Sequence, residues 1–184
     1  MSHQTPESVS AFWFQELEPR DWWVGGTHID TMIADRFGAT VESALKGELY
    51  TWRTTPEGRL AEIICLDQFT RNIFRGTARA FSGDGTALIL CQEAILGAHD
   101  LALPQSHRSF LYMPLMHSES LMMHDLAAEK LSGEGFEMTL KSLKEHTAVL
   151  AEFGRYPSRN KALGRTSTPA ERLYLENGTT WGQS

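Results

Sequence analysis

Cysteine is scarce in this chain, with two residues among 184. Cys65 and Cys91 lie in apolar runs, and no Cys-x-x-Cys or Cys/His spacing accompanies them. This pattern excludes a disulfide scaffold and a structural zinc site. We expect both thiols to be buried and to pack as small hydrophobic groups. We also expect that the protein binds no metal and no cofactor.

Long apolar runs and strand patterns are also missing. No uncharged apolar stretch approaches the roughly 18–20 residues that a membrane span needs, and the N-terminus lacks the basic and apolar regions of a secretory signal. These absences predict no membrane association and a cytoplasmic location. Alternation of apolar and polar residues with a period of two is essentially absent, which argues against β-strands.

Lysine is the rarer basic residue, since 12 of the 17 basic residues are arginine. Acids outnumber bases 23 to 17, and the resulting net charge of −6 argues against binding of nucleic acid. The charge is uneven along the chain, because residues 155–184 carry five basic and two acidic residues. An acidic protein therefore contains local arginine-rich segments.

Signals for helix starts recur along the chain. Thr5, Thr55 and Thr168 each stand directly before a proline, as a hydroxyl cap before the first helical position does. Thr168 and Glu171 also have the spacing of a capping box. We interpret Asp84, which follows Ser-Gly, as a fourth cap.

Apolar residues between these starts follow helical spacing. Two examples are the series Ile29, Ile33, Phe37, Val41, Leu45 and the series Phe136, Leu140, Leu143, Thr147, Leu150. Long helices are expected over 56–75, 84–101 and 107–131, with Pro114 kinking the last one or marking its first turn. We therefore predict a single all-α domain over 1–184, with seven or eight helices packed as antiparallel hairpins and a frayed tail at 177–184.

Charged side chains interrupt the most apolar of these helices. Asp67, Arg71 and Arg75 form a row at i, i+4 and i+8 within its apolar arc, where unpaired charge is unfavourable. One interpretation is a buried Asp67–Arg71 ion pair, with Arg75 reaching solvent. The other is that the row lines a cavity in which Arg71 and Arg75 hold an anion, helped by neutral donors from Gln68 and Asn72.

A second polar segment contains His117, Ser118 and Glu119, with His124 seven residues after His117 on the same helical face. A histidine beside a carboxylate can act in general acid/base catalysis, so His117 and Glu119 are the catalytic candidates. The alternative is that His117 is a partly buried, hydrogen-bonded side chain. No metal-ligand spacing is present, and Ser118 lies in no Gly-x-Ser-x-Gly context.

The third segment is basic and contains Arg155, Arg159, Lys161 and Arg165 before any acid appears. Several guanidinium groups beside the start of a helix favour an anion site. The alternatives are a solvated basic surface or arginines that fix loops to carboxylates. His146 lies at the border of an apolar face, where it either belongs to the core or faces this segment.

These segments together resemble a known family. The strings LDQF-x-RNIFRG, YMPLMHSE and FGR-x-P-x-RN-x-LGR occur in the order found in the bacterial DUF924 family, and the similarity runs from Phe12 to Leu175. The resemblance implies a tetratricopeptide-like α-α superhelix and no established activity.

The resemblance also implies a set of site residues, matched motif by motif. They are Asp67, Gln68, Arg71, Asn72, Arg75, Tyr112, His117, Ser118, Glu119, His146, Arg155, Arg159, Asn160 and Arg165. Two positions depart from the family pattern. Thr70 stands where proline is usual and should barely disturb a site. His124 replaces the usual glutamine and could alter hydrogen bonding around His117.

Three functions remain open. The first is a pocket for a small carboxylate or phosphate ligand, lined by Arg71, Arg75, Arg155 and Arg159 near His117 and Glu119, with an enzymatic role undecided. The second is a tetratricopeptide-like module that binds a peptide or partner protein, and the third is a purely structural buried network. Convergence of Arg71, His117 and Arg159 within about 10 Å around an open cavity would favour the first. Trp13, Trp22 and Trp23 serve either a homodimer interface or core packing.

Overall fold

The computed structural model describes residues 4–24 and 26–177 of the chain, and all regular structure in that part is helical. The all-α prediction is confirmed. The elements of the first part are α1 (Pro6–Ala11), η1 (Phe12–Glu16), α2 (Pro19–Val24), α3 (Thr27–Leu45), η2 (Tyr50–Thr54), α4 (Pro56–Ile63), η3 (Ile64–Phe69), α5 (Thr70–Ile73) and η4 (Ala78–Phe81). Those of the second part are α6 (Asp84–Leu96), η5 (Asp100–Ala102), α7 (Gln105–His117), α8 (Leu121–Lys130), α9 (Glu137–Phe153), η6 (Pro157–Arg159) and α10 (Pro169–Asn177).

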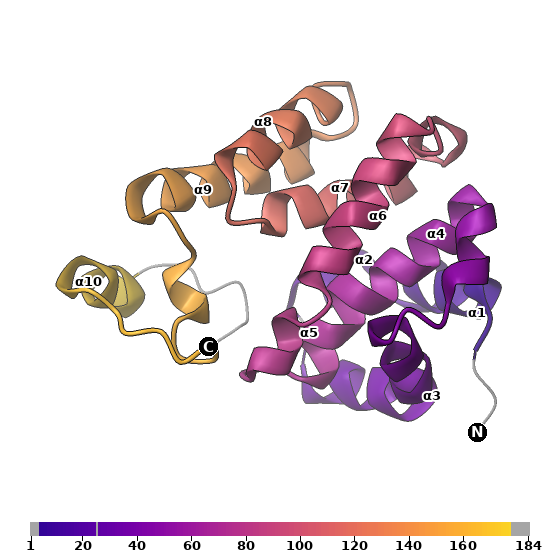
Figure 1. Ribbon diagram of the computed structural model, residues 1–184, viewed down its shortest axis with the longest axis horizontal. Helices are drawn as coiled ribbons and strands as arrows, with labels where there is room; N and C mark the ends of the chain where they lie inside the picture. The colour runs from indigo at the N-terminus through magenta and orange to yellow at the C-terminus, as the bar shows by residue number, and fades with distance from the viewer. Residues whose placement is uncertain (1–3, 25, 178–184) are drawn as a thin grey trace.

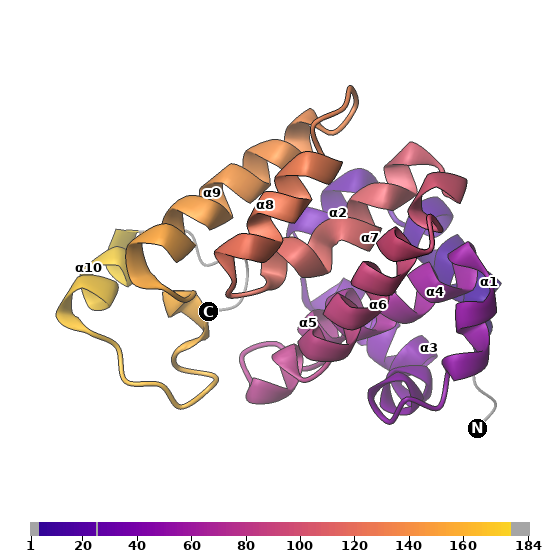
Figure 2. The same cartoon turned by 45° about the horizontal axis from the view of Figure 1, so that its top comes forward.

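The helices are arranged in chain order across the molecule (Figure 1). The elements α1–α5 gather at one end, α6 and α7 lie in the middle, and α8 runs beside α9. Both views place α10 at the opposite end, where it packs with η6 (Figure 2). The α4–α5 region and η6 are far apart in the sequence. Contacts between their residues therefore form near the middle of the molecule, where the two ends face each other.

Three of the four predicted helix caps are present. The hydroxyl of Thr5 accepts a hydrogen bond from the backbone N–H of Ser8, and that of Thr55 accepts one from Gly58. Thr168 and Glu171 form the reciprocal capping box, with N···O distances of 3.2 and 2.7 Å. Each bond satisfies an N–H that has no partner within its own helix.

The prediction that Asp84 caps a helix is wrong. Gly83 occupies the N-cap of α6, no side chain caps that helix, and Asp84 is its first residue. The carboxylate of Asp84 instead binds two arginines, described below.

Two predicted helices end earlier than expected. The helix at 84–101 stops at Leu96, and a short 3₁₀ turn follows at Asp100–Ala102. The single helix at 107–131 is wrong, because the chain leaves helical geometry between α7 and α8 at Ser118–Ser120. Pro114 lies inside α7 rather than in a first turn. The break occurs where the carbonyl groups of His117 and Ser118 accept hydrogen bonds from side chains of other elements.

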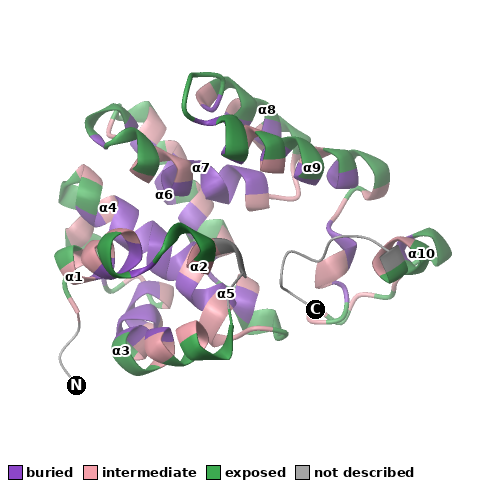
Figure 3. Ribbon diagram, turned by 180° about the vertical axis from the view of Figure 1, so that it is seen from behind, coloured by how far each residue is buried: buried purple, intermediate pink, exposed green. Residues whose placement is uncertain are grey.

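The main core is built from residues between Val9 and Leu143, and the continuous stretch of α4 and η3, together with α7, contributes the most buried residues to it (Figure 3). A smaller cluster of Val149, Leu150 and Tyr156, joined by Phe153 and Tyr174, lies toward the C-terminal end. The single-domain assignment stays a prediction.

The tryptophans near the N-terminus differ in their surroundings. Trp13 is buried against Phe69 and Phe110, so core packing explains it. Trp22 is partly buried, and its indole N–H donates to the Trp13 carbonyl. The side chain of Trp23 and the tail at 178–184 lie outside the described residues. The homodimer stays a prediction.

Among the described residues, none of the helices combines the length and the apolar character that crossing a bilayer requires. The tetratricopeptide-like superhelical arrangement stays a prediction.

Candidate functional site

A π-helix positions the most deeply buried carboxylate of the site. The continuous helical stretch that starts at Pro56 changes to π geometry over Ile64–Phe69 and returns to α geometry at Thr70. Such short π segments inside α-helices are frequent at functional sites. Asp67 lies within this segment, and its side chain is completely buried.

Three side chains surround the Asp67 carboxylate. Nδ1 of His117 lies 2.8 and 3.0 Å from its two oxygens, and the Gln68 amide donates to Oδ2 at 2.6 Å. Nη1 of Arg71 lies 3.3 Å from Oδ1 and also donates to the Asp67 backbone carbonyl. Burial alone would raise the pKa of this carboxyl, but the charge of Arg71 and the bonds from His117 and Gln68 hold it well below its usual range. Asp67 is therefore ionised despite its burial.

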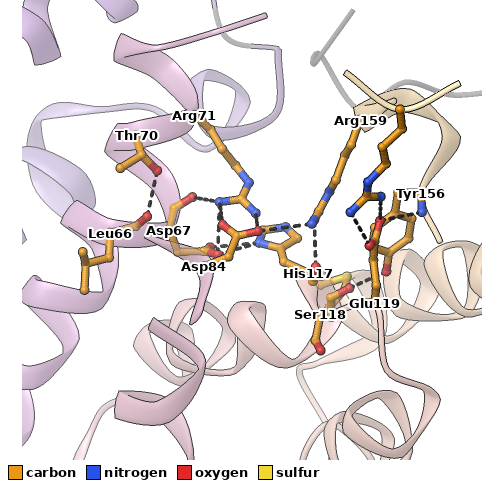
Figure 4. Close-up of polar contacts among 12 residues, drawn as sticks. Leu66, Asp67, Thr70, Arg71, Asp84, His117, Ser118, Glu119, Tyr156 and Arg159 are labelled. Carbon is orange, nitrogen blue, oxygen red and sulfur yellow. Dashed lines mark hydrogen bonds and ion pairs between the residues drawn. The ribbon is translucent and has the colours of Figure 1, made fainter. Parts of the chain in front are cut away.

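Asp84 joins two arginines from distant parts of the chain (Figure 4). Nη1 of Arg71 lies 2.9 Å from Oδ1 of Asp84, and Nη2 donates to Oδ2 at 3.1 Å. Nη1 of Arg159 donates to the same Oδ2 at 3.2 Å, and its Nη2 donates to the His117 carbonyl at 2.7 Å. Asp67, Arg71, Asp84, His117 and Arg159 thus form one connected group, here called the arginine cluster.

Aromatic rings hold the two guanidinium groups in place. The Arg159 guanidinium lies 4.9 Å from the ring centroid of Phe81 and 4.7 Å from that of Tyr156, and Arg71 lies 5.7 Å from Phe81. Cation–π contacts of this kind strengthen when the partners are removed from water. The side chains of Arg71 and Arg159 are each 11% exposed, His117 is 16% exposed and Asp84 is 22% exposed. The arginine cluster is thus largely, but not fully, enclosed.

Two histidines behind the cluster are also buried. His146 donates from Nδ1 to the Ser142 carbonyl, and its ring centroid lies 6.1 Å from that of His117. His124 contacts the Ser118 carbonyl and the Tyr156 hydroxyl through Nε2. No hydrogen bond joins the described atoms of His124 to His117. This departure from the family pattern therefore affects the contacts with Ser118 and Tyr156, and not the hydrogen bonds of His117 itself.

The remaining predicted residues fall into separate groups. Glu119 forms a two-pronged ion pair with Arg165 and accepts a hydrogen bond from the Tyr156 N–H. Arg155 pairs in the same way with Glu171. The Asn160 amide donates to the Ser167 hydroxyl at 3.0 Å. These contacts anchor the segment that carries Arg159.

Three further predicted site residues lie outside the arginine cluster, and the side chain of Thr70, which departs from the family pattern, forms its hydrogen bond outside it. Arg75 and Asn72 both donate to Asp30, so Arg75 does not join the arginine cluster. The Arg75 side chain pairs with Asp30 and is 30% exposed to solvent. Tyr112 donates to Asp100. Thr70 is buried, and its hydroxyl donates to the Leu66 carbonyl, on the side away from Asp84 (Figure 4).

Sequence reasoning missed Asp84, Phe81 and Asp30. Charge balance could have indicated Asp84, because two arginines in apolar surroundings need buried carboxylates as partners. Asp67 supplies one of these, and Asp84 was interpreted as a cap. The partner of Arg75 lies 45 residues away in α3, and no local pattern announces it.

Comparison with known proteins confirms the resemblance to the DUF924 family. The family model "Bacterial protein of unknown function (DUF924)" matches residues 9–179. The chain belongs to the DUF924 family. The solved structure of a protein of unknown function, ATU0120 from Agrobacterium tumefaciens, is 35% identical to this chain and superposes with a TM-score of 0.86. The match covers 94% of this DUF924 chain and 97% of the other. None of the curated proteins matches it.

The chemistry available to this DUF924 protein centres on His117. Its Nδ1 donates to the ionised Asp67, and no described residue is hydrogen-bonded to its Nε2. A carboxylate that orients a histidine in this way leaves Nε2 ready to accept a proton. Glu119, the other catalytic candidate, is held by Arg165 and a backbone N–H. Within the described residues, no group of three or more His, Cys, Asp or Glu side chains is arranged to hold a metal ion.

The buried histidines predict that the protein loses stability in acid. Burial lowers the pKa of His146 to about 3, and it also lowers the pKa values of His117 and His124. The unfolded chain, with histidine pKa values of about 6.5, binds protons that the folded state does not bind. The free energy of unfolding should therefore fall as the pH drops below about 6.5, by up to about 1.4 kcal/mol per pH unit for each proton.

Urea unfolding of wild type and of His146→Gln between pH 8 and pH 4 measures this effect. The variant should show a shallower loss in acid, whereas His28→Gln, at an exposed position, should keep the wild-type slope. Equal slopes for wild type and His146→Gln would contradict the assignment of the acid sensitivity to His146.

Proposed function

We propose that the arginine cluster binds a small anionic ligand, whose carboxylate or phosphate group is held by Arg71 and Arg159. The observation that supports this proposal is the sharing of one oxygen, Oδ2 of Asp84, by both guanidinium groups. Two planar forks that converge on one oxygen already have the geometry with which arginines bind an oxyanion.

Hydrogen-bond donors remain available in the cluster. An arginine side chain carries five N–H donors. Arg159 directs two of them to described acceptors, Asp84 and the His117 carbonyl, which leaves three. No described residue accepts a hydrogen bond from Nε of Arg71 either. Both side chains are 11% exposed, and a ligand oxygen must reach these N–H groups through that exposed part.

One observation favours the structural alternative. Both arginines already have carboxylate partners, so the cluster satisfies its charges without a ligand. Partnered arginines also occur in binding sites, where they need the carboxylates to hold their orientation. The two functions differ in one measurable respect, because only a binding site is stabilised by an anion through mass action.

Thermal unfolding in inorganic phosphate or acetate, at constant ionic strength, tests the proposal. A specific ligand stabilises the folded state by about 2.7 kcal/mol at 100 times its dissociation constant. We expect saturable stabilisation of wild type that is lost in Arg159→Gln and reduced in Arg159→Lys, which keeps the charge but not the planar fork. Arg79→Gln is the matched control, because Arg79 pairs with Glu42 on the surface.

Phosphate also stabilises proteins non-specifically by exclusion from their surface. If the anion stabilised Arg159→Gln and Arg79→Gln equally, the whole stabilisation would therefore come from this non-specific exclusion and not from binding at the arginine cluster. That result, or no stabilisation of wild type by either anion, would favour a structural network.

A further inference from the structure

The charges of the arginine cluster cancel. Two carboxylates, Asp67 and Asp84, face two guanidinium groups, Arg71 and Arg159, with N···O distances of 2.9 to 3.3 Å. His117 is the fifth member, and burial favours its uncharged form by lowering its pKa. In the absence of a ligand, the cluster is thus neutral as a whole.

Neighbouring elements add no net charge. The groups that face His117 from the elements around it are Asp67 on η3, Arg71 on α5, Asp84 on α6, His124 on α8, His146 on α9 and Arg159 on η6. Tyr156 lies against His146 and His124. His124 and His146 have lowered pKa values and the pKa of Tyr156 is raised, so all three are uncharged at neutral pH. The nearby Glu119–Arg165 pair is internally balanced.

A bound anion would disturb this balance. The side chains of the cluster are between 0 and 22% exposed, so an extra negative charge would be poorly screened by water. One side chain, His117, can compensate for the added negative charge without moving. His117 already donates from Nδ1 to Asp67, and its ring lies between Arg71 and Arg159 (Figure 4). A proton on Nε2 would add a positive charge and a second donor beside the two guanidinium groups.

We infer that the ligand of this site is a monoanion, such as a carboxylate, and that it is taken up together with one proton that binds to Nε2 of His117. The inference rests on the proposed function, since it concerns the ligand held by Arg71 and Arg159. One proton balances one negative charge, so a dianion would leave the cluster at −1. The site therefore selects carboxylates over dianionic sulfate or phosphate.

Proton uptake has a direct signature in calorimetry. Titration of acetate into the protein near pH 7.5, in buffers of different ionisation enthalpy, should give a slope close to one proton taken up per acetate bound. Acetate affinity should fall about tenfold per pH unit above the pKa of His117 in the free protein. Sulfate, which remains a dianion at these pH values, should bind at least tenfold more weakly than acetate.

The variant His117→Asn tests proton uptake separately from binding of the anion. The asparagine amide can still donate to Asp67, but it cannot accept a proton. This variant should bind acetate more weakly, with no dependence on pH and no proton uptake. His107→Asn is the matched control on the same helix, because His107 stacks on Phe14 outside the cluster, and it should keep wild-type proton uptake.

The outcomes separate the two proposals. Acetate binding that requires Arg159 but takes up no proton, or sulfate binding as tight as that of acetate, would overturn the monoanion inference and leave the anion site standing. Proton uptake that persists in His117→Asn would overturn the role of His117. Absence of any Arg159-dependent binding of acetate, sulfate or phosphate would overturn both proposals.

Discussion

Replacing Arg71 with methionine should lower the free energy of unfolding by about 3–5 kcal/mol, because it removes one partner from a buried ion-pair network. The Arg71 side chain is 11% exposed and contacts both Asp67 and Asp84. Methionine keeps much of the length and the apolar packing, so the loss reports mainly on Asp67, which loses its guanidinium partner, and on Asp84, which keeps only Arg159. Urea unfolding at pH 7 measures the change.

Two further variants assign this effect. Arg79→Met breaks an exposed pair with Glu42 and should change stability by no more than about 1 kcal/mol. Adding Asp67→Asn to Arg71→Met removes the buried charge that has lost its guanidinium partner, and the amide oxygen introduced there can still accept a hydrogen bond from His117. The double variant should therefore lose less stability than the sum of the single variants. A loss for Arg71→Met no larger than that for Arg79→Met would contradict the buried network.

Replacing Gly83 with alanine should destabilise the protein by about 1–3 kcal/mol, because the N-terminal end of α6 must move to accept a methyl group. A Cβ atom at this position would overlap the Leu66 carbonyl oxygen and lie 2.9 Å from the carbonyl carbon. Both contacts are with backbone, which cannot rotate away. Because Asp84 follows directly, its carboxylate should shift relative to Arg71 and Arg159, and the effect of Arg159→Gln on stability should become smaller in this background.

Gly85 provides the matched control for Gly83. It lies two residues later, in the first turn of α6, is exposed, and has open space where a Cβ would stand. Gly85→Ala should leave stability unchanged or raise it by about 0.5–1 kcal/mol, since alanine favours helix more than glycine does. If Gly83→Ala were as stable as Gly85→Ala, the close approach of α6 to the Leu66 carbonyl would not be a constraint.

Local signals in the sequence predict the local structure well. Thr5, Thr55 and Thr168 mark helix starts because the cap and its target N–H lie within three residues of each other. The Asp67–Arg71 pair is equally local, since residues four apart share a helical face. Such features depend only on the spacing of residues along the chain, which can be read directly from the sequence.

Features that depend on distant segments could not be predicted in the same way. Asp84 has the sequence context of a cap, and only packing against Arg71 and Arg159 gives its carboxylate another partner. The break after α7 has a similar origin, because side chains from α8 and η6 bind the carbonyl groups of Ser118 and His117. The grouping of Arg71 and Arg159 was anticipated as a hypothesis, whereas the pairing of Arg75 with Asp30 was not.

The contact between Arg159 and Asp84 has a consequence for the order in which the protein is made. The two residues are 75 positions apart, so Asp67, Arg71 and Asp84 leave the ribosome long before Arg159 does. Until then the two carboxylates share one guanidinium, and the nascent chain carries an unbalanced negative charge at its centre. Synthesis of the segment that contains Arg159 therefore completes the electrostatics of the helices made before it, and the arginine cluster forms only once that segment has been made.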